Sequence, residues 1–170
     1  VHNAAVALGV SIADVCRGFD SVSICLSKGL AAPVGTVLLG SREFIGRAHR
    51  YRKLLGGGMR QAGVIAAAGI VAIESMGERL AEDHRRARTL AEGLAQLPGV
   101  HVDLASVQTN MVYIEVADAP ALVTELARAG VLCNSMSGRS IRLVTHYHID
   151  DADIERTLQA AGRALEQLAA

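Results

Sequence analysis

Hydrophobic and polar residues alternate near the start of the chain. In "DSVSICL", residues 20–26, apolar side chains occupy every second position. This period of two predicts a strand, and the apolar run "VGTVLLG" after Pro33 predicts a second one. Ser41 then fits the N-cap of a helix that runs to about Leu55, with the positive charge of Lys53 in its last turn, as the helix dipole prefers. Three consecutive glycines end that helix.

A long alanine-rich segment follows, from about Gln61 to Leu94. It contains no proline and changes partway from almost entirely apolar to strongly charged. The pattern predicts one long connecting helix that is buried at its start and solvated at its end.

The second half of the chain, after the turn signal "LPG", predicts a compact α+β unit. Its expected elements are strands at 100–104 and 111–116, a helix at 119–129, strands at 131–134 and 140–145, and a helix at 150–168. Asp150 fits the N-cap of the last helix. We therefore expect an α/β chain with two domains, residues 1–95 and residues 96–170.

Composition and charge narrow the classes of function. Lysine plus arginine equals aspartate plus glutamate at 17 each, so no net field favours nucleic acid or an anionic membrane as a partner. No apolar run approaches the roughly 20 residues that a membrane helix needs. The 3 cysteines are odd in number and lie in apolar stretches, which argues against a disulfide framework and a zinc knuckle and favours a reducing, cytoplasmic setting.

Lys28 is the first candidate for chemistry, because it lies in the connection between the two predicted strands. A loop lysine is ordinarily a solvated charge without a specific role. Next to Gly29 and close to apolar strand ends, however, its amine could be desolvated and become a nucleophile toward an aldehyde. The hydroxyl of Ser27 could reach a phosphate.

The segment "RYRKLLGGGMRQ", residues 50–61, is a second candidate. Glycines let the backbone approach an anion, the next helix would present free N–H groups, and Arg60 could grip a phosphate. Alternatively, the glycines only end one helix and turn the chain into the next. The segment matches neither dinucleotide-binding nor P-loop spacing.

Arg142, in "SIRLVTHYH", is a third candidate because a guanidinium lies in the middle of a predicted strand. Either it faces water while its neighbours face the core, or it clamps a substrate carboxylate. His146 and His148 could lie on one face, but two imidazoles make a poor metal site when the nearby aspartates serve as helix caps. We expect no metal.

These segments occur together, in order, in one known pattern. "FDSVSICLSKGLAAPVG", "REFIGRAHRYRKLLGGGMRQAGVIAAAGI", "TNM" and "IRLVTH" resemble the low-specificity L-threonine aldolases, which depend on pyridoxal 5'-phosphate and have the aspartate-aminotransferase type of fold. The likeness covers the whole chain but only the C-terminal half of such an enzyme. It implies the end of the large cofactor-binding domain of a fold-type-I enzyme, the long connecting helix, and a small α+β C-terminal domain.

The resemblance also implies roles for particular residues. Lys28 would hold pyridoxal 5'-phosphate as an internal Schiff base, with Ser27 nearby. Arg60 would contact the cofactor phosphate in a neighbouring subunit's site, and Lys53 would lie near that shared site and the substrate. Arg142 would bind the α-carboxylate of an amino-acid substrate. The implied reaction cleaves L-threonine or a related β-hydroxy-α-amino acid to glycine and an aldehyde.

Two further expectations follow from the resemblance. The aspartate that pairs with the pyridine nitrogen in this family would immediately precede Val1, so we expect a fragment that binds the cofactor weakly and does not turn over alone. We also expect a homo-oligomer, a dimer or a homotetramer, serving threonine catabolism and glycine biosynthesis. Another β-eliminating lyase and a non-catalytic oligomerising fragment remain as alternatives.

Overall fold

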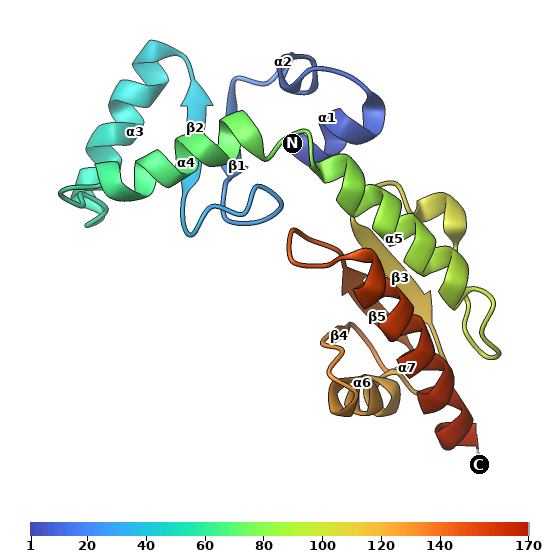
Figure 1. Cartoon of the computed structure of the whole chain (residues 1–170). Coiled ribbons are helices and arrows are strands. Elements are labelled where there is room, and N and C mark those ends of the chain that lie inside the picture. The colour runs from blue at the N-terminus through green and yellow to red at the C-terminus, as the bar shows by residue number, and fades with distance from the viewer. Residues whose placement is uncertain (170) are drawn as a thin grey trace. The chain divides into compact units, whose positions relative to one another are not determined.

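The chain forms two compact units in a computed structural model that describes residues 1–169 (Figure 1). The first unit is Val1–Leu80, and the second begins at Ala81. Each unit has its own hydrophobic core. No helix within residues 1–169 is both long and apolar enough to cross a membrane.

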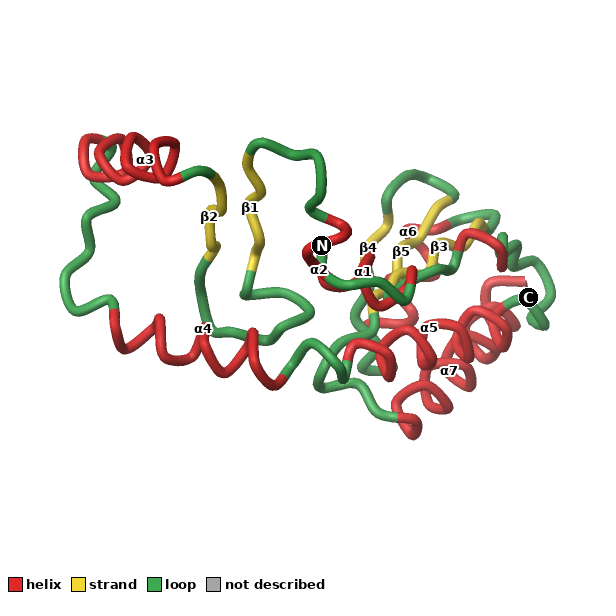
Figure 2. Tube along the Cα trace, turned by 90° about the horizontal axis from the view of Figure 1, so that it is seen from above, coloured by secondary structure: helices red, strands yellow, loops and turns green. Residues whose placement is uncertain are grey.

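The first unit consists of helices around a two-stranded hairpin. Strands β1 and β2 pair antiparallel, with Ser21 opposite Gly40 and Cys25 opposite Thr36 (Figure 2). Both predicted strands and the predicted helix after Ser41, whose hydroxyl accepts a hydrogen bond from the Phe44 N–H, are therefore confirmed. The elements are α1 (His2–Leu8), α2 (Ile12–Val15), β1 (Ser21–Cys25), β2 (Thr36–Gly40), α3 (Arg42–Leu54) and α4 (Gly63–Ser75).

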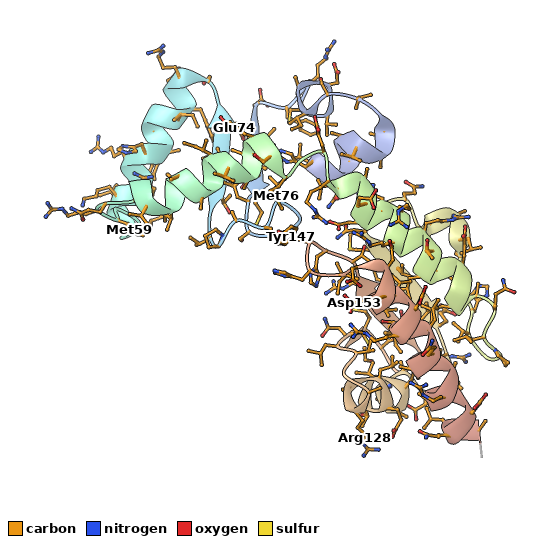
Figure 3. All side chains as sticks on the ribbon, viewed as in Figure 1. Met59, Glu74, Met76, Arg128, Tyr147 and Asp153 are labelled. Carbon is orange, nitrogen blue, oxygen red and sulfur yellow. The ribbon has the colours of Figure 1, made fainter. Side chains whose placement is uncertain are left out.

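The long connecting helix predicted for residues 61–94 is wrong in two respects. The structure has two helices, α4 and α5 (Leu80–Leu94), with an interruption that contains Gly77. Most of the apolar first helix is also exposed rather than buried: the side chain of Val64 is 80% exposed. The first unit has too few elements to cover every side of a helix that is apolar all round. Met59 and Met76 lie near the two ends of α4 (Figure 3).

The second unit is the predicted α+β unit. Three antiparallel strands are ordered β3-β5-β4, with helices packed against one face. The predicted strand at 100–104 is wrong, because this segment forms only an isolated bridge from His101 to Glu115 before a 3₁₀ turn. The elements are α5, η1 (Leu104–Ser106), β3 (Met111–Glu115), α6 (Ala119–Arg128), β4 (Asn134–Ser135), β5 (Ser140–Val144) and α7 (Asp151–Ala169).

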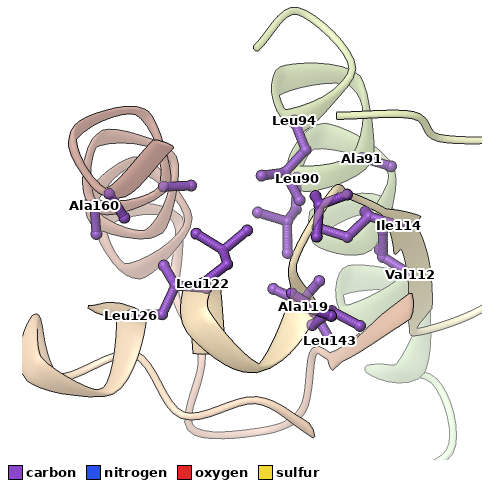
Figure 4. Close-up of a cluster of buried hydrophobic side chains, with 14 of the residues drawn as sticks. Leu90, Ala91, Leu94, Val112, Ile114, Ala119, Leu122, Leu126, Leu143 and Ala160 are labelled. Atoms are coloured by element: carbon purple, nitrogen blue, oxygen red, sulfur yellow. The ribbon is translucent and has the colours of Figure 1, made fainter. Parts of the chain in front are cut away.

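The core of the second unit lies between its sheet and its helices (Figure 4). Alternate residues of the strands, such as Val112 and Ile141, are fully buried, and the helices contribute leucines and alanines at helical spacing. Because α5 packs into this core, the boundary between the two units lies after Leu80. The sequence had placed the domain change near residue 96.

Polar contacts position the ends of the helices in the second unit. Asp150 caps α7 as predicted, since its carboxylate accepts a 2.9 Å hydrogen bond from the Asp153 N–H. Arg85 on α5 reaches across to Asp151 in the first turn of α7 at 2.8 Å. This hydrogen bond is the largest cause of a lowered Asp151 pKa.

Candidate functional site

Lys28 lies in a structured loop directly after β1. The Ala31 N–H donates to the Lys28 carbonyl at 2.8 Å, which closes a tight turn, and the Ala32 N–H donates to the Leu26 carbonyl at 3.0 Å. Leu26 and Leu30 are buried on either side of the lysine. The buried leucines therefore anchor the backbone of the loop, whereas Lys28 itself is exposed rather than desolvated as the sequence suggested.

A cavity of about 240 Å³ lies beside this lysine within the first unit. A side chain at Gly29 would bring Cβ to 2.9 Å from Leu80 Cδ2, so only glycine fits without displacing the wall. The side chains of Lys28, Ser23, Cys25, His2 and Asn3 line the cavity. An amine thus stands at the edge of a small, mainly polar enclosure.

His2 is the residue of this enclosure that sequence reasoning did not find. Its side chain is buried, and its Nε2 has no hydrogen-bond partner among the described residues. Burial is the largest cause of a lowered His2 pKa, so the imidazole is neutral at neutral pH. A lone histidine at the start of a short apolar helix carries no spacing signal, and only the folded chain brings it to the cavity.

Cys25 belongs to the same enclosure, although its place in an apolar strand favours a small core residue. The structure leaves it half-buried in the cavity wall, with Sγ 3.4 Å from the Oγ of Ser27. The hydrogen bond with Ser27 is the largest cause of a lowered Cys25 pKa, and the charge of Lys28 adds to it. Ser27 is therefore engaged with this thiol.

The glycine segment after α3 approaches the end of that helix closely. Gly56 has a φ of 83°, and a Cβ at Gly58 would lie 2.6 Å from Lys53 Cδ. The glycines thus end one helix and turn the chain, which is the plainer of the two interpretations of this motif. No side chain caps the start of α4, and Arg60 just before it is exposed. Arg60 does not line the cavity beside Lys28, and its phosphate-binding role stays a prediction.

Arg142 occupies the middle of β5 in the second unit. Its neighbours Ile141 and Leu143 are buried, whereas Arg142 is half-buried on the opposite face, as the alternation predicted. Its Nε is nevertheless covered and has no hydrogen-bond partner within residues 1–169. Lys28 and Arg142 belong to different units. Among residues 1–169, each unit contains one buried side-chain nitrogen without a hydrogen bond, His2 Nε2 in the first and Arg142 Nε in the second.

The histidines after β5 interact with each other. The Nδ1 of His146 accepts a 3.3 Å hydrogen bond from the His148 N–H, and the two rings meet edge to face. Within residues 1–169, no three metal-binding side chains gather at one point.

Comparison with known proteins places these residues in a family. The model of the beta-eliminating lyase family matches residues 1–117, which include Lys28, Lys53 and Arg60. The chain belongs to the beta-eliminating lyase family. Low-specificity L-threonine aldolase 1 of Arabidopsis thaliana is 43% identical over 170 residues, 97% of this chain and 48% of the relative. The low specificity L-threonine aldolase of Escherichia coli is 43% identical over 151 residues, 88% of this chain and 44% of the relative.

Solved structures show the fold of this beta-eliminating lyase family member. A protein of Listeria monocytogenes assigned as an L-allo-threonine aldolase superposes with a TM-score of 0.78 at 19% identity, covering 96% of this chain and 49% of the other. Serine palmitoyltransferase of Sphingomonas wittichii superposes with a TM-score of 0.74 at 20% identity, covering 92% of this chain and 42% of the other. The expected fold class, that of fold-type-I pyridoxal-phosphate enzymes, is confirmed. The chain spans about half the length of the curated relatives it matches.

Proposed function

We propose that the chain contributes Lys28 and Arg142 to a pyridoxal-phosphate-dependent carbon–carbon lyase. The reaction would cleave L-threonine or a related β-hydroxy-α-amino acid to glycine and an aldehyde. The observation that carries the proposal is that an anchored loop places Lys28 at the edge of a cavity, in a chain of the beta-eliminating lyase family. The names of the Arabidopsis and Escherichia coli relatives support the substrate class.

The residues beside Lys28 fit the proposed cofactor. The cavity wall contains a buried nitrogen without a hydrogen-bond partner among the described residues, His2 Nε2. This feature suits a polar group that enters from outside the chain. Lys28 would hold pyridoxal 5'-phosphate covalently through Nζ, and Ser27 would reach its phosphate. Arg60 would bind the cofactor phosphate in a neighbouring subunit's site. When bound, the cofactor accepts the electron pair released as the substrate Cα–Cβ bond breaks.

The other proposed roles concern orientation. Arg142 would bind the substrate α-carboxylate with its forked donors, which fixes the direction of the Cα–Cβ bond. Lys53, which lies against the glycine segment, would contribute a positive charge near the substrate. Neutral His2 has a free nitrogen that could hold a proton at the cavity.

We extend the proposal to a homo-oligomer, a dimer or tetramer, assembled through α4. This helix is apolar on nearly all sides, but only Gly69 and Ala72 are buried. Val64, Ile70 and Val71 are large apolar residues of α4 that remain more than half exposed. A second copy would remove this surface from water. The same exposed helix supports the alternative of a non-catalytic fragment that only assembles with other subunits.

A second candidate reaction is β-elimination by the same residues. The description of the matching family favours it, because it names beta-eliminating lyases. Lys28 and Arg142 would serve either reaction, so the products must decide. Aldol cleavage of L-threonine gives glycine and an aldehyde, whereas elimination gives a keto acid and ammonia.

The first test is a visible absorption titration with pyridoxal 5'-phosphate. Lys28 and Lys53 are the only lysines in the sequence, which offers a matched pair of variants. We expect Lys28→Arg to abolish the visible band, because arginine keeps the charge but cannot attach the cofactor. Lys53→Arg should retain the band. Equal bands in both variants would refute the assignment of Lys28.

The second test identifies the products formed from L-threonine. The loaded protein is incubated with the amino acid, and glycine, aldehyde, keto acid and ammonia are quantified. We expect little or no turnover by the chain alone, and any products to be glycine and aldehyde in equal amounts. Keto acid and ammonia without glycine would establish the elimination alternative instead.

A further inference from the structure

Three polar side chains form a row across the sheet of the second unit. Arg142 on the central strand β5 is directly opposite Tyr113 on β3 and directly opposite Asn134 on β4. Residues that are paired in register project from the same face, with Cβ atoms about 4.5–5.5 Å apart. The guanidinium is thus flanked on one side by a phenol and on the other by an amide.

This row lies on the face of the sheet that the core does not use. Ile141 and Leu143, on either side of Arg142, are buried against the helices, whereas Asn134 is exposed and Tyr113 is 44% exposed. A ligand could therefore reach all three side chains without opening the core.

The guanidinium in the middle of the row lacks an acceptor. Its Nε is covered but unbonded within residues 1–169, and no ion pair of the described residues involves Arg142. Five other arginines of this unit have carboxylate partners, namely Arg85, Arg86, Arg88, Arg128 and Arg156. Among the described residues, only Arg142 has a buried guanidinium nitrogen without a hydrogen bond. A covered arginine N–H without a partner is costly unless an anion accepts a hydrogen bond from it.

We propose that Asn134 and Tyr113 complete a carboxylate-binding site around Arg142. A carboxylate offers two oxygens with about four lone-pair positions, and a guanidinium fork satisfies only two of them. The amide N–H₂ of Asn134 donates to a remaining position. Tyr113, paired with Arg142 across the two strands, limits the rotation of its side chain, which makes Tyr113 a positioning residue. That the carboxylate is the α-carboxylate of an amino acid rests on the proposed function.

The site is tested by NMR on the full ¹⁵N-labelled chain, with glycine as the probe and ethylamine as the probe that lacks a carboxylate. The arginine Nε–Hε signal of Arg142 is identified by its loss in Arg142→Lys. We expect glycine, and not ethylamine, to shift this signal. Asn134→Ala should weaken the apparent affinity for glycine about tenfold, the value of one hydrogen bond to a charged group.

Further variants separate the roles in the row. Asn134→Asp should weaken glycine binding more than Asn134→Ala, because like charges then face each other. Tyr113→Phe should bind nearly as well as the parent, whereas Tyr113→Ala should lose about two- to threefold because the guanidinium is freer. Ser135→Ala is the matched control. Ser135 lies on the same short strand as Asn134 but pairs with Ile141, whose side chain faces the core. The affinity of this variant for glycine should not change.

Two results would overturn the inference. One is equal glycine affinity in Asn134→Ala and Ser135→Ala, and the other is an Arg142 signal that does not respond to glycine. Neither result depends on cofactor attachment, which reports on Lys28 in the other unit. Failure of the carboxylate site and failure of the proposed function therefore give different results.

Discussion

The two units differ in how completely they bury their own apolar residues. Of the residues described, 1–169, seventeen form the buried cluster of the second unit, and six form that of the first. Exposed large apolar residues show the reverse distribution, and most of them, including Leu55, Val64 and Ile70, lie in the first unit. The second unit therefore closes its own core, whereas the first leaves many large apolar residues exposed.

The difference follows from the pattern of each helix. Helices α5, α6 and α7 each have one apolar side, and the sheet covers that side. Helix α4 is apolar all round, and a two-stranded hairpin cannot surround it. A helix of this kind indicates an interface with other protein.

The largest expected effect contrasts one buried and one exposed leucine. Leu126 of the second core is 1% exposed, and Leu55 of the first unit is 86% exposed. Leu126→Ala should lower the free energy of unfolding by about 2–5 kcal/mol through lost burial and a residual cavity. Leu55→Ala should change it by less than about 0.5 kcal/mol. Urea denaturation followed by circular dichroism measures both, and similar losses would contradict the contrast.

A smaller effect is expected from a buried hydrogen bond of the second unit. The Thr145 hydroxyl donates to the Asp83 carbonyl at 2.6 Å, away from water. Thr145→Val keeps the shape but removes this buried hydrogen bond between the end of β5 and α5, which should cost about 0.5–1.5 kcal/mol. Thr124→Val is the control, because its exposed hydroxyl bonds the Pro120 carbonyl at 2.9 Å and water can replace it. A loss as large in the control would show that burial does not matter here.

A change on α4 tests whether the first unit assembles with a second copy. Val71→Glu places a charge on the exposed apolar surface and should weaken self-association at least about tenfold, equivalent to about 1.4 kcal/mol. Leu132→Glu, at a residue 87% exposed in the second unit, should leave association unchanged. Sedimentation equilibrium measures both variants. Equal association constants would remove α4 from the interface.

The smallest expected effect is the acid dependence of folding. Burial lowers the pKa of His2 in the first unit and of His84 in the second. At pH values between these lowered pKa values and the ordinary histidine pKa of about 6.5, the unfolded chain binds more protons than the folded chain does. The free energy of unfolding therefore rises with pH in this range. The stability that the two neutral histidines contribute is complete above about pH 6.5 and is lost as the pH falls below that value. The pKa values of Asp14 and Asp151 are lowered too, and their contributions are lost only below about pH 4.

Urea midpoints at about pH 7.5 and about pH 5, on either side of the ordinary histidine pKa, measure the histidine contributions. His2→Gln and His84→Gln should each reduce the difference between the two midpoints, because glutamine cannot take up the proton. A difference unchanged in His2→Gln would mean that the imidazole at the cavity is not held neutral by the fold.

Sequence patterns predicted most helices and strands, because these patterns depend on residues that are close together in the chain. The alternation around Ile24 and the caps at Ser41 and Asp150 operate over a few residues, and the structure confirms all of them. The burial of the long apolar segment could not be predicted in this way. Helical period shows which residues are apolar, but only the tertiary arrangement decides whether anything covers them.

In the candidate site too, some residues could be predicted from local sequence patterns and others could not. Lys28 and Arg142 stand in motifs, and the resemblance of those motifs to one enzyme family is enough to select both residues. His2 and Asn134 belong to no recognisable spacing, because the fold brings one beside Lys28 and strand register brings the other beside Arg142. Neighbours of this kind are determined by long-range contacts and become visible only in three dimensions.

The central claim is that Lys28 is the residue that holds the cofactor. The most direct measurement is borohydride reduction of the chain with pyridoxal 5'-phosphate, followed by peptide mapping by mass spectrometry. We expect a stable adduct on the peptide that contains Lys28 and little on the one that contains Lys53. An adduct divided equally between the two lysines, or carried only by Lys53, would contradict it.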